Sequence, residues 1–398
     1  YSLLADYFSP KVRATVISIY ASGLYIGSGI GIFIGGLIVD NWNNAYPIIS
    51  EAPFGLKGWQ VAFMAVGIPG MLLALLTWQI KEPPRGLSEG LSSSESKNPL
   101  KETFKELVGL TPFGLVGSDN FKKELSINIT FTVLIFLASY YLYVLTGDFL
   151  QWTAFGIGVY VICNWIHGLK NRDPVAFLLI FKSKALLLGL LSFPFITFVT
   201  YALGAFGPSF YIRNFSMTAT EVGIIYGLIT VFGSMIGVIC GGILGDKLRE
   251  SYVNGKLYLI MTSAVLTSVT AIGFIHSENL VASFTWKFFY HIASTAWLGC
   301  AASTVTELVL PRLRAIASAF FILMLSMIGL ALGPYLTGMV SDIYINSGLL
   351  PGPALKNAMT LTLVVLILPF GLLAVACKYL KNDEAEIYEK ARSLGEEI

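Results

Sequence analysis

The chain has 398 residues, of which 55% are hydrophobic and only 13% are charged, and its mean hydropathy is +0.72. Soluble domains carry roughly 25% charged residues, so this composition excludes a soluble globular protein and indicates an integral membrane protein. The net charge of +2 gives no indication of a nucleic-acid partner.

The first long apolar segment is residues 14–39, which carry no charge and are numerous enough to cross a bilayer with some tilt. It follows Pro10-x-x-Arg13. Glycine recurs in it at four-residue spacing, at Gly23, Gly27, Gly31 and Gly35. This spacing places the four glycines on one helix face, where another backbone can approach closely.

Nine further spans follow, which gives ten full spans in an all-α membrane protein. They are 59–80, 127–146, 150–166, 185–212, 221–245, 257–275, 282–309, 315–341 and 357–378. Residues 1–8 read as the end of another helix, and the chain begins at Tyr1 rather than at methionine, so we expect it to be truncated at its N-terminus.

The polar region 87–124 is expected to be a cytoplasmic linker. Its apolar residues Leu100, Phe104, Leu107 and Val108 share one helical face, opposite Lys101, Glu102, Lys105 and Glu106. This pattern is typical of a helix on the membrane surface, and a solvated linker helix is the alternative.

Basic residues set the orientation. With Arg13 inside and the spans alternating, all but four of the 26 Lys and Arg residues lie on the inner side. The exceptions are Lys57, Arg213, Lys287 and Lys356. We therefore expect a multi-pass protein of the inner or plasma membrane with a cytoplasmic C-terminal tail.

A short segment occurs twice. Asp6-x3-Pro10-x-x-Arg13 is repeated as Glu307-x3-Pro311-x-x-Arg314, at a constant offset. Two copies so far apart in one polytopic chain suggest two related halves, a plan common among secondary transporters.

Four features together resemble the major facilitator superfamily, and within it the Spinster-like branch. They are the repeated segment, the Gly58-Trp59-Gln…Phe63 opening of the second span, the exit Glu82-Pro-Pro-Arg-Gly86, and Gly241-Gly-Ile-Leu-Gly245-Asp246-Lys247-Leu-Arg249. The resemblance covers residues 1–86 and about 175–380. It implies two six-helix bundles around a central cavity, working by alternating access on a small organic or amphiphilic anion.

On this map the chain divides into five parts. These are the remnant of an N-terminal half (1–86, the end of helix 4 with helices 5 and 6), the linker (87–124), an extra transmembrane hairpin (125–168), a C-terminal half (175–380, helices 7–12) and a tail (381–398). The chain departs from the family pattern in lacking helices 1–3 and most of helix 4, and in carrying the hairpin. Proton-coupled oligopeptide transporters have a helix pair at a similar place and remain an alternative, as does a non-transporting receptor or scaffold.

Span 221–245 has a second glycine series, at Gly233, Gly237, Gly241 and Gly245. The family's fifth and eighth helices meet between the halves, so the two series are expected to face each other. Close packing within each bundle is the alternative, because small residues indicate close contact without identifying the partner.

Asp246 lies where span 221–245 meets the cytosol. By the family resemblance, we expect it to accept hydrogen bonds from the N-terminus of helix 315–341 and to pair with Arg314, which would latch the inner side shut. Arg13 with Asp6, Arg314 with Glu307, and Arg249 are candidates for the same latch. Simple anchoring at a positive inner face is the alternative for Arg249.

Span 282–309 contains Lys287 and His291, one turn apart, and then Thr295 on the same face. Ionisable residues inside a span are candidates for a functional site because burying them in lipid is costly. We predict that they line the cavity and contact substrate, together with Tyr201 of span 185–212. A snorkelling lysine beside a packed histidine is the alternative.

All four cysteines lie in apolar helical runs, so no metal site or cofactor is expected. The sequence contains no phosphate-binding loop that would indicate use of ATP. It also contains no paired His or acidic ligands that would indicate an enzyme. The expected partners are a small-molecule substrate, a coupling proton or other ion, and membrane lipid.

Overall fold

The computed structural model describes residues 1–80, 100, 104, 107–111 and 121–393. Within these ranges the chain is helical and contains no strand. The exit segment 82–86, most of the linker and the end of the tail lie outside the described residues. So do Lys101, Glu102, Lys105 and Glu106, which leaves the surface-helix prediction untested.

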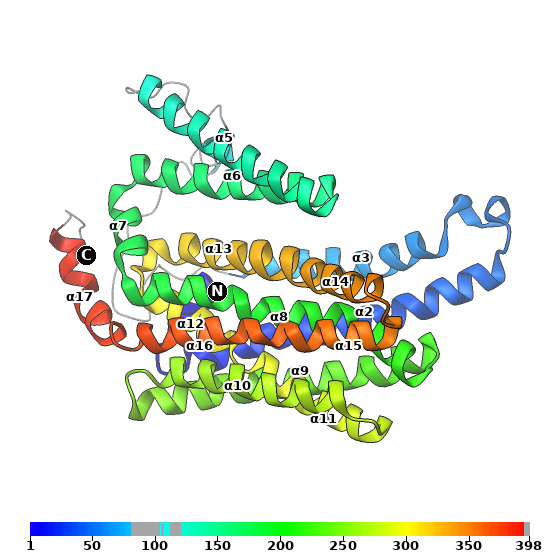
Figure 1. Cartoon of the computed structure of the whole chain (residues 1–398). Coiled ribbons are helices and arrows are strands. Elements are labelled where there is room, and N and C mark those ends of the chain that lie inside the picture. The colour runs from blue at the N-terminus through cyan, green and yellow to red at the C-terminus, as the bar shows by residue number, and fades with distance from the viewer. Residues whose placement is uncertain (81–99, 101–103, 105–106, 112–120, 394–398) are drawn as a thin grey trace.

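Apart from the segment between α3 and α5, most of which lies outside the described residues, the helices follow one another with short connections (Figure 1). The first group is α1 (Ser2–Tyr7), α2 (Arg13–Ala45), η1 (Ile49–Glu51), η2 (Pro53–Gly55), α3 (Gly58–Thr77), α5 (Phe121–Thr146), α6 (Phe149–Arg172) and α7 (Pro174–Lys182). The second is α8 (Lys184–Phe215), α9 (Ala219–Ser251), α10 (Gly255–His276), α11 (Leu280–Thr295), α12 (Leu298–Glu307), η5 (Pro311–Leu313), α13 (Arg314–Met324), η6 (Leu325–Leu330), α14 (Ala331–Asn346), α15 (Pro351–Thr362), η7 (Leu363–Leu366), α16 (Ile367–Ala376) and α17 (Leu380–Ser393).

Nine continuous helical stretches in the described ranges are long and apolar enough to cross a membrane. They coincide with nine of the ten expected spans. The tenth, residues 282–309, is divided into α11 and α12 around Trp297. There the indole of Trp297 donates to the carbonyl of Ser294 (3.0 Å), and this side-chain bond accompanies the break in the helix.

The span at 315–341 is also irregular. It is α-helical at both ends, but Leu325–Leu330 form a π-helical turn just before Pro334. Proline has no N–H to donate to the preceding turn, and such local widenings are commonly found where a helix bends. Gly329 and Gly333 on this stretch pack against Thr197 and Phe198 of α8.

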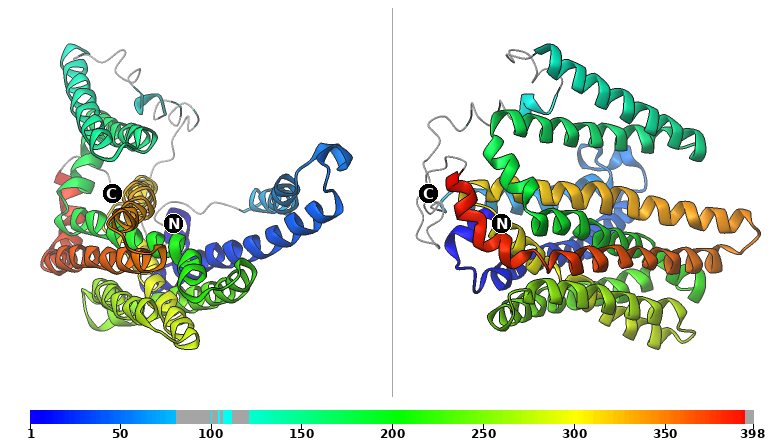
Figure 2. Two further views of the ribbon diagram at one scale, coloured as in Figure 1. Left: turned by 45° about the vertical axis from the view of Figure 1, so that its right-hand side comes forward. Right: turned by 60° about the vertical axis from the view of Figure 1, so that its left-hand side comes forward.

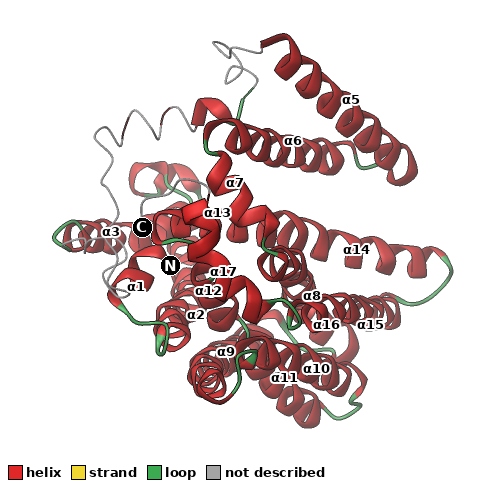
Figure 3. Cartoon of the chain, turned by 90° about the vertical axis from the view of Figure 1, so that its left-hand side faces the viewer, coloured by secondary structure: helices red, strands yellow, loops and turns green. Residues whose placement is uncertain are grey.

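Helices α8–α16 form the body of the molecule, and the first half of α2 packs into it (Figures 1 and 3). The far end of α2, together with α3, extends away from this body, as the turned view shows (Figure 2). Most side chains of α3 are exposed. The core of the body is aromatic and aliphatic, with Phe193, Phe274 and Phe321 almost fully buried.

The α5–α6 hairpin lies along α13 and α14 on one side of the body (Figure 1). Tyr335 donates to Asp148 at the hairpin turn (2.6 Å), and the ring of Trp165 stacks on Phe320 at 5.3 Å between centroids. Contacts near both ends of the hairpin therefore attach it to α13–α14.

Candidate functional site

Lys287 of α11 is fully enclosed by the helical body. Its ammonium group lies over three aromatic rings, at 4.2 Å from the centroid of Phe274, 4.4 Å from Tyr290 and 4.9 Å from Tyr226. The residue has 0% exposure, and its Nζ has no hydrogen-bond partner among the described residues. The snorkelling alternative is therefore wrong, and in this conformation Lys287 faces a cage of rings rather than an open cavity.

His291, one turn further along α11, is held by two hydroxyl groups of α9. Thr230 Oγ1 is 3.1 Å from Nε2, and Ser234 Oγ is 3.3 Å from Nδ1. Thr230 already donates its single hydroxyl hydrogen to the carbonyl of Tyr226 (2.8 Å), so it can only accept from Nε2–H. The network thus assigns a neutral ring with the proton on Nε2 and with Ser234 donating to Nδ1.

These side chains belong to two facing rows with the same spacing. Tyr226, Thr230 and Ser234 follow each other at every fourth position of α9, as Lys287, His291 and Thr295 do in α11. The hydroxyl of Thr295 completes the match: its single hydrogen is shared between the carbonyls of His291 (2.8 Å) and Ser234 (3.0 Å). The row on α9 was missed by the sequence analysis, although its spacing was visible there.

The glycine series of α9 brings these rows together. A methyl group on Gly233 would lie 2.8 Å from Cβ of His291, and one on Gly237 would lie 2.7 Å from Cα of Ile292. Gly241 and Gly245 meet Ala296 and Cys300 in the same way. The series therefore packs against α11 and α12 within one bundle, and the prediction that it faces the first series is wrong.

Tyr201 lies on α8, in the middle of the chain. It is 42% exposed and is not among the residues that contact Lys287 or His291, so its predicted role at the substrate stays a prediction.

Helices α2 and α9 pack closely, as expected, but through different glycines. A methyl group on Gly242 or on Gly299 of α12 would lie 2.7 Å from the carbonyl oxygen of Ala14 and would also overlap Ser18. At Gly23, Gly27, Gly31 and Gly35 no atom lies within 4 Å of such a methyl group in the described structure. The first glycine series is thus not part of this contact.

Asp246 caps the N-terminus of α2 rather than that of α13. Its carboxylate accepts from the amides of Ala14 (3.3 Å) and Thr15 (2.7 Å) and from the hydroxyl of Thr15 (2.7 Å). Helix α2 has no cap from its own residue Val12, so Asp246 supplies acceptors for amides that have none within the helix. The expected capping role is present, but the expected partner was wrong.

The remaining latch candidates also exchange partners. Arg314 pairs with Asp6 at 2.9 Å, and both side chains are almost fully buried. Glu307 pairs with Lys256 at 2.6 Å, and Lys256 lies 3.4 Å from Asp246. Arg13 donates to the carbonyl of Ala5 (2.9 Å).

Arg249 contacts the C-terminal helix α17, where it pairs with Glu384 at 2.5 Å. Burial raises the pKa of the Glu384 carboxyl, and the nearby guanidinium of Arg249 offsets part of that effect. In the same helix Asp383 accepts from the hydroxyl of Ser183 (2.9 Å) and the amide of Ala185 (2.8 Å), at the start of α8. Arg249 therefore binds α17 to its own bundle and does not join α9 to α2.

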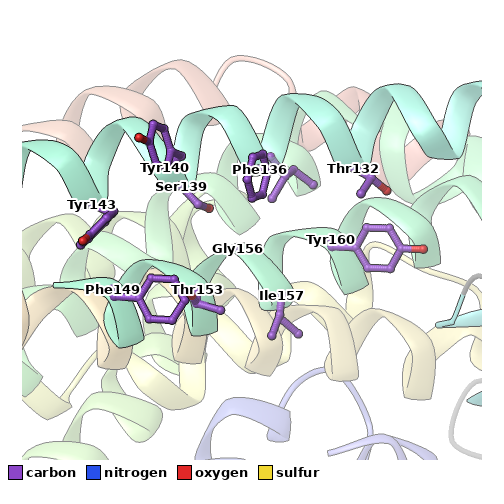
Figure 4. A pocket seen from close by; sticks show the side chains of 11 residues that line it. Thr132, Phe136, Ser139, Tyr140, Tyr143, Phe149, Thr153, Gly156, Ile157 and Tyr160 are labelled. Atoms are coloured by element: carbon purple, nitrogen blue, oxygen red, sulfur yellow. The ribbon is translucent and has the colours of Figure 1, made fainter.

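A cavity of about 310 Å³ lies between α5 and α6. Figure 4 shows it lined by aromatic and small side chains, with Phe136 and Tyr140 on α5 and Phe149 on α6. It is separate from the Lys287 cluster and has a mainly apolar lining.

The model for the Major Facilitator Superfamily matches residues 1–334. This chain belongs to that superfamily. It is a multi-pass membrane protein of a transporter family, which is not a family of enzymes, and such transporters bind small molecules.

Several curated proteins are similar. An "MFS-type efflux pump" of Mycolicibacterium smegmatis is 30% identical over 50% of this chain and 45% of its own length. "Protein spinster" of Drosophila melanogaster is 21% identical over 86% of this chain and 43% of its own, which confirms the Spinster-like resemblance. A "Cis,cis-muconate transport protein" of Acinetobacter baylyi is 23% identical over 60% of this chain and 50% of its own. The chain spans about half the length of the curated relatives it matches.

Among solved structures, a bacterial homologue of the human lysosomal transporter Spinster, inward-facing and unoccupied, matches with a TM-score of 0.47 and 22% identity. That match covers 98% of this chain and 74% of the other.

Proposed function

We propose that this chain acts within a secondary transporter that moves a small organic or amphiphilic anion by alternating access. The proposal depends mainly on Lys287, a lysine that is buried in the bundle and has no carboxylate paired with it in the described residues. An uncompensated buried cation is costly, and an anionic substrate would supply the missing partner. His291, one turn away, would add a second group that can become cationic.

The contacts between α2 and the body support a moving interface. Several polar links join residues 1–15 to the second half of the chain, among them Asp246 with Thr15 and Arg314 with Asp6. Both lie at the end of the spans that the basic-residue distribution places in the cytosol. A latch of a few charged hydrogen bonds is strong when closed and is lost as a unit when the helices separate.

The choice of an anion also agrees with one relative. The protein of Acinetobacter baylyi is described as transporting cis,cis-muconate, and muconate is an organic dianion. We take muconate as the first probe and make no assignment of the physiological substrate. A proton is the proposed coupling ion, because His291 has a neutral form that its hydroxyl partners accommodate.

The test is uptake of radiolabelled cis,cis-muconate by proteoliposomes that contain the full-length protein, at several pH values. We expect uptake of the dianion but not of its neutral dimethyl ester, loss of uptake in Lys287→Ala, and an altered pH profile in His291→Ala. Lys57→Ala, outside the bundle, is the matched control.

Wild-type uptake and pH dependence in both variants would overturn the proposal. Uptake of a dipeptide instead of muconate would favour the oligopeptide-type alternative. Binding of muconate with no transport of any probe would favour a receptor.

A further inference from the structure

The ring cage around Lys287 has one wall that differs from the other two. Phe274 and Tyr290 are buried at 0% and 1% exposure, whereas Tyr226 is partly exposed. Removing Phe274 or Tyr290 from the ammonium would require repacking of the core. Tyr226, which packs on the edge of the core against Tyr211, is therefore the ring of the three whose departure would disturb the core least.

Tyr226 is held lightly at its outer end. Its hydroxyl donates to the carbonyl of Gly204 on α8 over a long 3.4 Å, at an exposed position. The phenol lies against Gly207, where a methyl group would overlap it. At Gly204, by contrast, nothing lies within 4 Å of where a methyl group would be, so the face of α8 beside Gly204 is open.

Tyr226 is also connected to His291, the second basic residue of the cluster. The backbone carbonyl of Tyr226 accepts from Thr230, and Thr230 accepts from Nε2 of His291. The ring of Tyr226 also stands edge-on to the imidazole, with 5.9 Å between centroids. Tyr226 thus contacts both Lys287 and His291 and separates them from the exposed side of α8.

We propose that Tyr226 is a lid over an anion site formed by Lys287 and His291. In the closed state its ring faces the ammonium and partly replaces water through a cation–π contact. When the ring turns into the space beside Gly204, the ammonium offers its three donors to an oxyanion head group, a carboxylate or a phosphate monoester. This inference rests on the proposed function, since it specifies how the same site admits its anion.

The lid can be tested without transport, through the chemical reactivity of the Lys287 amine. The purified full-length protein is treated with a small amine-acetylating reagent, and peptide mass spectrometry measures acetylation at Lys287 relative to the exposed Lys57. We expect slow acetylation in the wild type. In Tyr226→Ala the rate should rise more than about tenfold, because the closed population is removed.

Two milder variants keep the test decisive if Tyr226→Ala does not fold. Tyr226→Phe loses only the long hydroxyl bond to Gly204 and should raise acetylation by about twofold, the effect of a weak hydrogen bond. Gly207→Ala should raise it also, because the added methyl group displaces the phenol. Tyr258→Ala, an exposed tyrosine of α10, is the control that should leave Lys287 unchanged. Slow acetylation of Lys287 in all three test variants would overturn the lid.

The anion is tested in the opened Tyr226→Phe variant with benzoate, phenyl phosphate and neutral benzyl alcohol. Protection of Lys287 by benzoate indicates a carboxylate ligand, protection by phenyl phosphate indicates a phosphate ligand, and either supports the site. Protection by neither, or equal protection by benzyl alcohol, would overturn it. If the lid and the protection behave as expected but no anion is transported, only the proposed function fails.

Discussion

Replacing Asp246 should weaken the contact between α2 and the body more than the substitution of any exposed residue nearby. Asp246→Ala removes the acceptor for two amides and one hydroxyl at the start of α2. Loss of a helix cap costs about 0.5–2 kcal/mol, and hydrogen bonds to a buried charge contribute about 1.5–3 kcal/mol. Lys256 keeps Glu307 as a partner, so no buried cation is left alone. We expect a total loss of about 3 kcal/mol.

The assay is the free energy of unfolding in mixed micelles, with Glu384→Ala as the matched control. Glu384 is another carboxylate with a basic partner at this end of the spans, but its pair with Arg249 is about a quarter exposed. Its removal should cost no more than about 1 kcal/mol. A double-mutant cycle of Asp246→Ala with Thr15→Val should give a coupling of about 1 kcal/mol. Equal losses for Asp246→Ala and Glu384→Ala, or zero coupling to Thr15, would refute the capping interpretation.

Three further predictions follow from the same contacts. Gly242→Leu should prevent α2 from packing against α9, so the variant should lose its monodisperse peak in size-exclusion chromatography. Gly27→Leu should elute as the wild type does. The reverse pattern would contradict the contact of Gly242 with α2. Arg314→Met should destabilise the protein by about 3–5 kcal/mol, because it leaves the carboxylate of Asp6 buried. The control Arg312→Met breaks a pair that is about 30% exposed and should cost about 1 kcal/mol or less. Similar unfolding midpoints for the two variants would contradict this prediction. Lys390→Cys should react with a membrane-impermeant maleimide only after cells are permeabilised, and ready labelling of intact cells would contradict the predicted orientation.

The spans and the family were readable from the sequence because both depend on local information. Whether 20 consecutive residues can cross a bilayer is decided by their own apolarity, and the structure has a continuous helix at nine of the ten expected spans. The repeated Pro-x-x-Arg segments and the Asp246 segment likewise identified the superfamily. The break at Trp297 was not foreseen, because it involves a bond from the indole to a nearby carbonyl that hydropathy does not register.

Partners were decided only by the tertiary structure. Glycine at every fourth position shows that one helix has a narrow face, but the spacing belongs to one helix and a contact belongs to two. The series of α9 therefore packs on α11 and α12, and Gly242, outside that series, meets α2. Asp246 could have capped either helix that begins with Pro-x-x-Arg, since both have the same free amides, and the packing of α2 against α9 determined which one. The sequence contains the two rows of side chains on α9 and α11 as four-residue spacings. Only the register of the two helices in space places Tyr226 between Lys287 and the exposed side of the bundle.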